Sequence, residues 1–265
     1  MYSEVIAKIN LSVKKKEEQF LNYKVSYAIN GMLAGAYVGL GIILILIIGG
    51  SLYQQFPFIV PIAMGLSFGL ALTLVFMAGA DLFTGNTMVL PLSVFCGNLR
   101  WQTALKMLFV NYLSNFLGSV FLAIIIYYSG VLKYEQINNF LQFMAHKKNQ
   151  LDPLSLFCRG ILCNWLVALC VWCCYRLQSE SAKIMLIFWC LFGFITPGYE
   201  HSIANMSLLT LARLHHFAEE NLWQEIFYNL TFVSLGNIFS GMFLVAGSYF
   251  LMSESTKVAN EWKEI

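Results

Sequence analysis

An acidic residue and a histidine, Glu200 and His201, stand side by side within an apolar stretch that extends from about residue 184 to 212. They follow Pro197 and Gly198, which are residue types that end or interrupt helices. Ionisable groups are costly inside a membrane span, so such a pair is a candidate functional site. The chemistry within its reach is proton transfer, hydrogen bonding to a small solute, or metal binding.

An enzyme or a metal centre would need partners for this pair. A nucleophile needs its base, and a metal needs several ligands at fixed spacing. The sequence has no E-x-x-H or H-E-x-x-H pattern, and His146, His215 and His216 fall in expected loops. The seven cysteines lie mostly in apolar runs, where cysteine packs as a small hydrophobe. We expect no enzymatic activity, no metal and no cofactor; a membrane redox enzyme that uses Glu200, His201 and the cysteines is the alternative from another class.

Long uncharged runs point to a membrane protein. Hydrophobic residues make up 58% of the 265 residues and charged residues 11%, against about a quarter charged in soluble proteins. No Asp, Glu, Lys or Arg occurs between Lys24 and Asp81, within 107–132 or within 226–253. Each run reaches the roughly 20 residues that cross a bilayer core. The net charge of +2 gives no sign of a nucleic-acid partner, and we expect none.

Six membrane spans are expected, and the second and fifth contain polar breaks. Their approximate ranges are 27–50, 59–80 with an apolar continuation to 95, 107–129, 155–175, 184–212 and 226–252. The polar stretches 133–153 and 213–225 are expected to be loops. A polar break at membrane depth must be buried in protein or line a cavity, because lipid cannot satisfy loose backbone groups.

We expect the chain to divide into a cytoplasmic amphipathic segment over 1–24, a six-helix transmembrane domain over 25–253 and a cytoplasmic tail over 254–265. The apolar positions of the first segment suit a helix that lies on the cytoplasmic surface, and a solvated tail is the alternative. Eleven lysine and arginine residues fall on the side of the two termini and five on the other side. The positive-inside rule therefore places both termini in the cytoplasm.

Both breaks share a residue pattern, which indicates an internal repeat. The pattern occurs as Gly79, Asp81, Asn86 and Asn115 in the first half and as Gly198, Glu200, Asn205 and Asn237 in the second half. The offset is 119 residues at the acids and 122 residues at the last asparagines. Three spans per half would insert the second copy upside down, with broken helices that meet near the midplane. We therefore predict an all-α membrane protein with a 3+3 inverted repeat.

The polar groups near the breaks suit a path for an anion. Asparagine, threonine and histidine side chains supply hydrogen bonds without a fixed charge, whereas cation filters typically present acidic rings. The helix starts at 84–86 and 202–204 are expected to direct backbone N–H groups towards the centre. We expect each acid to accept from backbone N–H groups and to hold its broken helix. The residues expected to shape the breaks are Asp81, Gly85, Asn86, Gly198, Asn205, Asn115 and Asn237.

These motifs resemble those of the formate–nitrite transporter family. They read Ala-Gly-Ala-Asp-Leu-Phe-Thr-Gly-Asn over 78–86 and Gly-Tyr-Glu-His-Ser-Ile-Ala-Asn-Met over 198–206, within a similarity that extends from about 25 to 250. The segments 34–45 and 162–167 are most similar to the nitrite-channel branch found in bacterial inner membranes. The resemblance implies an aquaporin-like six-helix protomer that assembles into a homopentamer with one pore per protomer.

The resemblance also implies where the pore residues lie. The pore centre would consist of His201, Glu200, Asn164 and Thr84. The cytoplasmic constriction would consist of Leu72, Leu82 and Phe83, and the periplasmic one of Phe68 and Phe194; ordinary helix packing is the alternative for these apolar residues. The basic residue at the outer mouth would be Lys148, with Lys147 or Arg159 as alternatives. Residues 82–86 would form a mobile loop that gates the cytoplasmic side.

We predict a passive or proton-coupled channel for small monovalent anions in the bacterial inner membrane, with nitrite as the first choice. Formate and hydrosulfide are alternatives within the family, and a pore for neutral solutes is the rival outside it. His201 would offer the anion a hydrogen bond or a proton, because the ordinary pKa of histidine, about 6.5, is close to the working pH.

Overall fold

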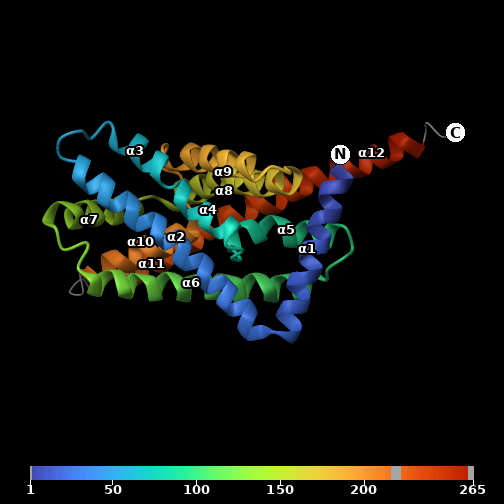
Figure 1. Ribbon diagram of the computed structural model, residues 1–265, viewed down its shortest axis with the longest axis horizontal. Helices are drawn as coiled ribbons and strands as arrows, with labels where there is room; N and C mark the ends of the chain where they lie inside the picture. The colour runs from blue at the N-terminus through green and yellow to red at the C-terminus, as the bar shows by residue number, and fades with distance from the viewer. Residues whose placement is uncertain (1, 216–221, 262–265) are drawn as a thin grey trace.

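The computed structural model describes residues 2–215 and 222–261, and every regular element within these ranges is helical (Figure 1). In chain order the elements are α1 (Tyr2–Asn22), α2 (Lys24–Leu52), α3 (Val60–Ser67), α4 (Gly69–Met77), α5 (Phe83–Phe95), α6 (Trp101–Ser129), α7 (Glu135–Asn149), α8 (Pro153–Arg176), α9 (Glu180–Ile195), α10 (Ser202–His215), α11 (Leu222–Phe239), the π-helix η1 (Ser240–Gly247) and α12 (Ser248–Glu261). Within the described residues, five stretches are long and apolar enough to cross a membrane: Lys24–Leu52, Val60–Met77, Trp101–Ser129, Pro153–Arg176 and Trp223–Glu254. The protein is a helical multi-pass membrane protein.

Two pairs of long helices, α2 with α6 and α8 with α11, form the frame that positions the breaks. The backbones approach closely at glycines. A Cβ atom at Gly35 would meet the backbone of Asn115, and one at Gly160 would meet the backbone of Val233. Small residues at such contacts are typical of membrane helices, because close packing rather than removal from water drives their association.

Both polar stretches interrupt helices in the same way. Helix α4 ends at Met77 and α9 at Ile195, and each is followed by a glycine in the left-handed region, Gly79 at φ 76° and Gly198 at φ 77°. Each end is closed by a backbone bond that spans five residues, from Ala80 N to Val75 O at 2.9 Å and from Tyr199 N to Phe194 O at 3.0 Å. This is the geometry in which glycine ends a helix without the steric cost of a Cβ atom.

The chain becomes helical again sooner than expected after the first break. Residues 83–86 belong to the first turn of α5, so only the short segment between Met77 and Phe83 is non-helical. The expectation of a loop over 82–86 was wrong for four of its five residues. Phe83 can start the helix because its backbone N–H group is bound by Asn115 from α6, so the helix end does not need a loop to reach a partner.

Helix α1 lies across one end of the bundle (Figure 1). Its apolar face is buried at Val5, Ile6, Ile9 and Val13, and it contacts α5, α2 and α8. The apolar stripe that predicted a surface helix therefore packs against protein.

Helix α7 was missed by the sequence analysis, which expected a loop over 133–153. The segment is polar overall, but Ile137, Phe140, Leu141 and Ala145 recur at helical spacing and are buried. This spacing is typical of an amphipathic helix. The ring of Phe140 fills the space left by the missing side chain of Gly49 on α2.

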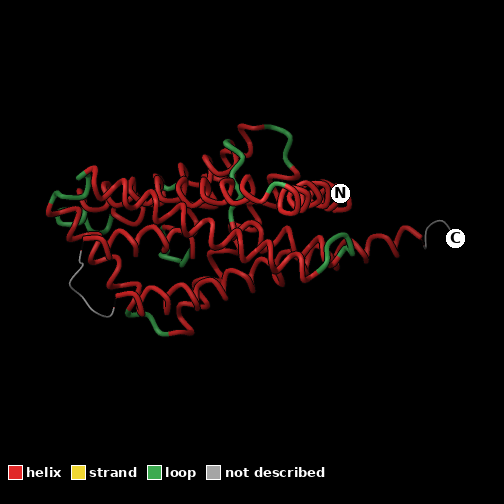
Figure 2. The backbone as a smooth tube through the Cα atoms, turned by 90° about the horizontal axis from the view of Figure 1, so that it is seen from below, coloured by secondary structure: helices red, strands yellow, loops and turns green. Residues whose placement is uncertain are grey.

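The two terminal helices, α1 and α12, lie at the same end of the molecule (Figures 1 and 2), and α7 lies at the opposite end (Figure 1). Of the loop expected over 213–225, residues 213–215 and 222–225 are helical. Residues 216–221, which include His216, lie outside the described residues.

Candidate functional site

His201 joins the two breaks. It immediately precedes α10 and is only 4% exposed. Its Nδ1 atom accepts the N–H of Ala204 at 3.1 Å, and its Nε2 atom lies 3.1 Å from Oγ1 of Thr84 on α5. Because a backbone amide can only donate, Nδ1 is the acceptor and the proton of the neutral ring lies on Nε2. The imidazole is therefore oriented as a hydrogen-bond donor, and Thr84 Oγ1 accepts from it.

A small cavity of about 10 Å³ adjoins the histidine. Its lining comprises His201, Phe68, Leu72, Leu82, Phe194, Val38, Ala71, Val167 and Leu191. The Phe68 and Phe194 rings meet edge to face at 6.0 Å, and the Phe194 ring stacks on the imidazole at 5.7 Å. A single water needs roughly 10–15 Å³ of such space. The structure thus brings four of the five predicted constriction residues together with His201 in one small apolar chamber.

The fifth predicted constriction residue, Phe83, points elsewhere. Its ring packs edge to face on Tyr112 of α6 at 4.7 Å between centroids. The side chain is buried, but it lines neither the small chamber nor the larger cavity described next. Its position agrees with the alternative that Phe83 takes part only in ordinary helix packing.

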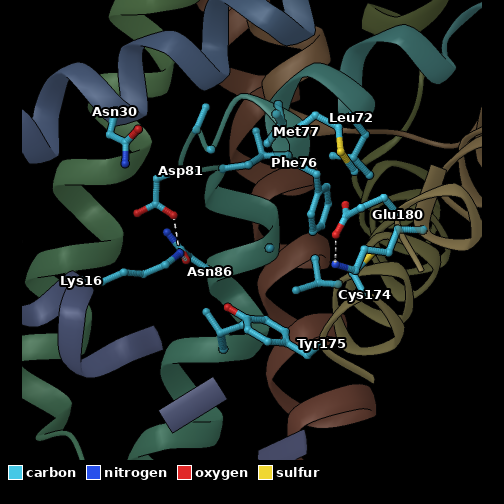
Figure 3. A pocket seen from close by; sticks show the side chains of 18 residues that line it. Lys16, Asn30, Leu72, Phe76, Met77, Asp81, Asn86, Cys174, Tyr175 and Glu180 are labelled. Carbon is cyan, nitrogen blue, oxygen red and sulfur yellow. Dashed lines mark hydrogen bonds and ion pairs between the residues drawn. The ribbon is translucent and has the colours of Figure 1, made fainter. Parts of the chain in front are cut away.

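A larger cavity of about 380 Å³ opens beside the first break (Figure 3). Leu72 and Leu82 line both this cavity and the small chamber, so these two side chains separate them. Asp81, Asn86 and Gly85 also line the larger cavity. Two of the three residues expected at the inner constriction therefore form the wall between an open mouth and the histidine chamber.

The acid of the first break is bound by a lysine from α1. Lys16 Nζ forms an ion pair with Asp81 and donates to Oδ1 of Asn86 at 2.7 Å (Figure 3). The lysine side chain is 23% exposed and the aspartate 6%. Burial lowers the pKa of Lys16, but the charge of Asp81 and the hydrogen bond to it leave the pKa raised above its ordinary value of 10.5. Lys16 was not among the predicted site residues, although it interrupts the apolar stripe of Ile9, Val13 and Phe20 at helical spacing.

The acid of the second break has the same kind of partner. Lys148 Nζ on α7 donates to both carboxylate oxygens of Glu200 at 2.9 and 2.8 Å, and the lysine side chain is 14% exposed. Asn205 Nδ2 donates to Glu200 Oε2 at 2.6 Å and to Asn229 Oδ1 at 2.8 Å. In the first break Asn86 likewise donates to Asn111 Oδ1 at 2.8 Å.

The basic residues expected at the outer mouth differ in their contacts and exposure. Lys148 is held by Glu200, whereas Lys147 is exposed. Arg159 donates from Nη1 to the carbonyl of Gly198 at 3.4 Å, and its own carbonyl accepts the N–H of Glu200 at 3.3 Å. Arg159 is therefore tied to the second break by both its side chain and its backbone.

Asparagines hold the loose backbone of both breaks. Asn115 Oδ1 accepts the N–H of Phe83 at 2.9 Å, while its Nδ2 donates to the carbonyls of Gly31 and Asp81 at 2.8 and 3.0 Å. Backbone groups left without partners in such an environment would each cost several kcal/mol. In the structure an asparagine therefore holds the backbone of the broken helix, a role that was predicted for the acid.

The second break repeats this arrangement. Asn237 Oδ1 accepts the N–H of Ser202 at 3.0 Å, and its Nδ2 donates to the carbonyls of Gly160 and Glu200 at 2.8 and 3.2 Å. The first N–H group of α10 is thus already occupied. It cannot serve an ion in the way that the sequence analysis expected of the residues at 202–204.

Asn164 is connected to the predicted pore centre through a chain of hydrogen bonds. Its Nδ2 donates to Thr87 Oγ1 at 2.9 Å and to the carbonyl of Asn237 at 2.6 Å. The Thr87 hydroxyl in turn donates to the carbonyl of Thr84 at 2.6 Å. Asn164 therefore reaches the partner of His201 through Thr87.

Within the described part of the chain, no group of three or more His, Cys, Asp or Glu side chains is placed to hold a metal ion. Cys158, Cys163, Cys170, Cys173, Cys174 and Cys190 are free thiols.

Comparison with known proteins agrees with this geometry. A model of the formate/nitrite transporter family matches residues 3–251. The nitrite transporter NirC of Salmonella typhimurium is 37% identical over 98% of this chain and 95% of its own length. A solved FNT family ion channel has a TM-score of 0.86 at 36% identity, covering 94% of this chain and 99% of its own. A pentameric formate channel with formate bound has a TM-score of 0.76 at 26% identity, covering 89% and 98%. The chain belongs to the formate/nitrite transporter family.

Proposed function

We propose that the protein is a channel for small monovalent anions, with nitrite as the first substrate. The observation that carries this proposal is the position of His201 in the lining of an apolar chamber. Its Nε2–H group is a hydrogen-bond donor at the point where the two breaks meet, and it is bonded there to Thr84. An anion that enters the chamber loses its hydration at a cost of several kcal/mol, and a fixed donor offsets part of that cost. The similarity to nitrite transporters over the whole chain supports nitrite.

The architecture that we infer is an aquaporin-like 3+3 inverted repeat of six spans. The second span would comprise α3, α4 and α5, and the fifth would comprise α9 and α10. The matched networks of Asn115 and Asn237 support the repeat. Residues 25–253 would form the channel domain, with 1–24 and 254–265 on the cytoplasmic side of the bacterial inner membrane. The pentameric state of the solved formate channel supports a homopentamer.

Transport would proceed in three steps. Basic groups at the outer mouth, with Lys147 the most exposed of the three candidates, would raise the local anion concentration. The apolar side chains of the chamber would admit the anion only without most of its water. His201 would then exchange its bond to Thr84 for one to the anion.

The bonding of His201 bears on whether it gives a hydrogen bond or a proton. With Nδ1 occupied as an acceptor, the neutral ring carries a single proton, and transfer of that proton would leave an imidazolate. Hydrogen-bond donation is therefore the favoured role. A proton-donor role would require the ring first to bind a second proton and to release Ala204.

The test is nitrite flux against pH in proteoliposomes for the wild type, His201→Gln and His201→Ala. We expect His201→Gln, which retains an N–H donor, to keep more flux than His201→Ala. A donor role predicts that His201→Gln keeps the pH profile of the wild type. Flux through His201→Ala equal to that of the wild type would remove the histidine from the mechanism.

Formate is the second candidate substrate, because a formate channel is among the similar structures. Competition among nitrite, formate and hydrosulfide for flux through one preparation would rank them. Flux without charge movement under a nitrite gradient would favour a neutral-solute pore. Membership of a transporter family is consistent with the absence of enzymatic activity.

A further inference from the structure

The larger cavity has a second lysine in its lining that the pore network does not use. Glu180 and Lys183 lie in the first turn of α9, and both line the cavity together with Tyr175 and Asn86 (Figure 3). This cavity leads to the wall formed by Leu72 and Leu82. A solute that passes between this mouth and the histidine chamber crosses a cavity whose lining includes the lysine.

The charges that line the cavity are two cations and two acids. Lys16 is committed to the first break, because its ammonium group binds both Asp81 and Asn86. Lys183 has a single acidic partner in its own helix, because its Nζ donates to Oε1 of Glu180 at 2.8 Å within one helical turn. Lys183 is the cation of this cavity that can change partners.

Burial differs between the two members of that pair. The side chain of Lys183 is 22% exposed, whereas that of Glu180 is 66% exposed. An exposed carboxylate is well solvated without its partner, and such surface pairs contribute little. The ammonium group has three donors and gives one to the carboxylate, so an anion in the cavity can bind Lys183 beside Glu180 or in its place.

We propose that Lys183 is a binding site for a small monovalent anion at this mouth, and that Glu180 competes with the anion for it. This inference rests on the proposed anion-channel function. It assigns to the mouth on the side of α1 the electrostatic capture that the outer basic residues would supply on the other side. The Lys183–Glu180 pair keeps the mouth near neutrality until an anion arrives.

The experiment measures nitrite flux against nitrite concentration for full-length protein in proteoliposomes. We expect Lys183→Gln to raise the half-saturating concentration about threefold and Glu180→Gln to lower it by a similar factor, as one charge near a partly screened site would. Lys183→Arg should behave like the wild type. Added sodium sulfate should shrink the difference between Lys183→Gln and the wild type, because salt screens exposed charges.

The matched control is Lys106→Gln, an exposed lysine on α6 that lines neither cavity. Opposite shifts from the Lys183 and Glu180 variants support the site, because a merely structural loss would impair both. Shifts of the same sign, or a Lys183→Gln curve equal to the Lys106→Gln curve, overturn it. Absence of anion flux in the wild type would instead overturn the proposed function and the site with it. Elution of each variant as the wild-type oligomer confirms that it has folded.

Discussion

At the scale of single residues, the apolar side chains near the breaks are of two kinds. Some line the chamber beside His201, and others only pack against neighbouring helices. Phe194 stacks on the imidazole and lines the chamber, whereas Phe83 rests on Tyr112 and lines neither cavity. Both are buried phenylalanines beside a break, so composition cannot distinguish them. Their positions predict different effects on permeation.

We predict that Phe194→Leu raises the water permeability of proteoliposomes and that Phe83→Leu does not. The shorter side chain at 194 enlarges a space of about 10 Å³, which is at the lower limit for one water. Stopped-flow light scattering under an osmotic gradient measures the difference. Equal permeability of the two variants would mean that Phe194 does not narrow the path. Comparable unfolding temperatures would show that both substitutions were tolerated.

At the scale of elements, two amphipathic helices hold the breaks from opposite ends. Helix α1 supplies Lys16 to Asp81, and α7 supplies Lys148 to Glu200. Removal of one partner of a buried pair leaves a charge without compensation, which is more damaging than replacing both. The attachment of α1 therefore depends on an ion pair as well as on its apolar face.

We predict that Lys16→Met lowers the free energy of unfolding by about 1–3 kcal/mol, since Lys16 is partly exposed and the neighbouring charges are only partly desolvated. The pKa of Lys16 is raised in the folded state. The pair therefore contributes fully below the ordinary value of 10.5, and its contribution declines as the pH rises through the raised value. The difference between wild type and variant should stay constant from about pH 6 to 9.

Thermal unfolding in detergent, followed by tryptophan fluorescence, measures this difference at each pH. The control is Lys15→Met, because Lys15 is an exposed neighbour on α1. A difference that vanished towards pH 9 would contradict the assigned pair, as would an equal loss in the control.

At the scale of the whole molecule, many large apolar side chains remain exposed along the spans, including Phe109, Phe121, Trp189 and Phe227. Lipid and neighbouring subunits are the surroundings that cover such faces in a membrane. The similar formate channel is pentameric.

We therefore predict that limited chemical cross-linking of the protein in native membranes gives a ladder that ends at five subunits. Light scattering of the detergent-solubilised protein should give the corresponding mass. A ladder that stopped at two or three would contradict the pentamer. Denaturation with SDS before cross-linking is the control, and it should leave only monomer.

Much of the architecture could be predicted from the sequence because its signals are local. Uncharged runs of 20 residues or more predict membrane spans. A glycine two residues before an acid, as in Gly79 and Asp81, marks the end of a helix. Both breaks were located through Gly79 and Gly198, and His201 was singled out by its apolar surroundings. Helix α7 was missed because the segment is polar overall and its period-3.6 stripe was not weighed.

The sequence by itself determined where helices stop and which polar groups stand in the gaps, because these features depend on residues within one or two turns. Only the tertiary structure decided which groups meet. Lys16 and Asp81 are 65 residues apart, and Lys148 and Glu200 are 52 apart. Helical periodicity tells which face of α1 or α7 is covered, but not which element covers it. The partners of the two acids, the packing of Phe83 on Tyr112 and the place of Lys183 at the mouth follow from how the helices pack.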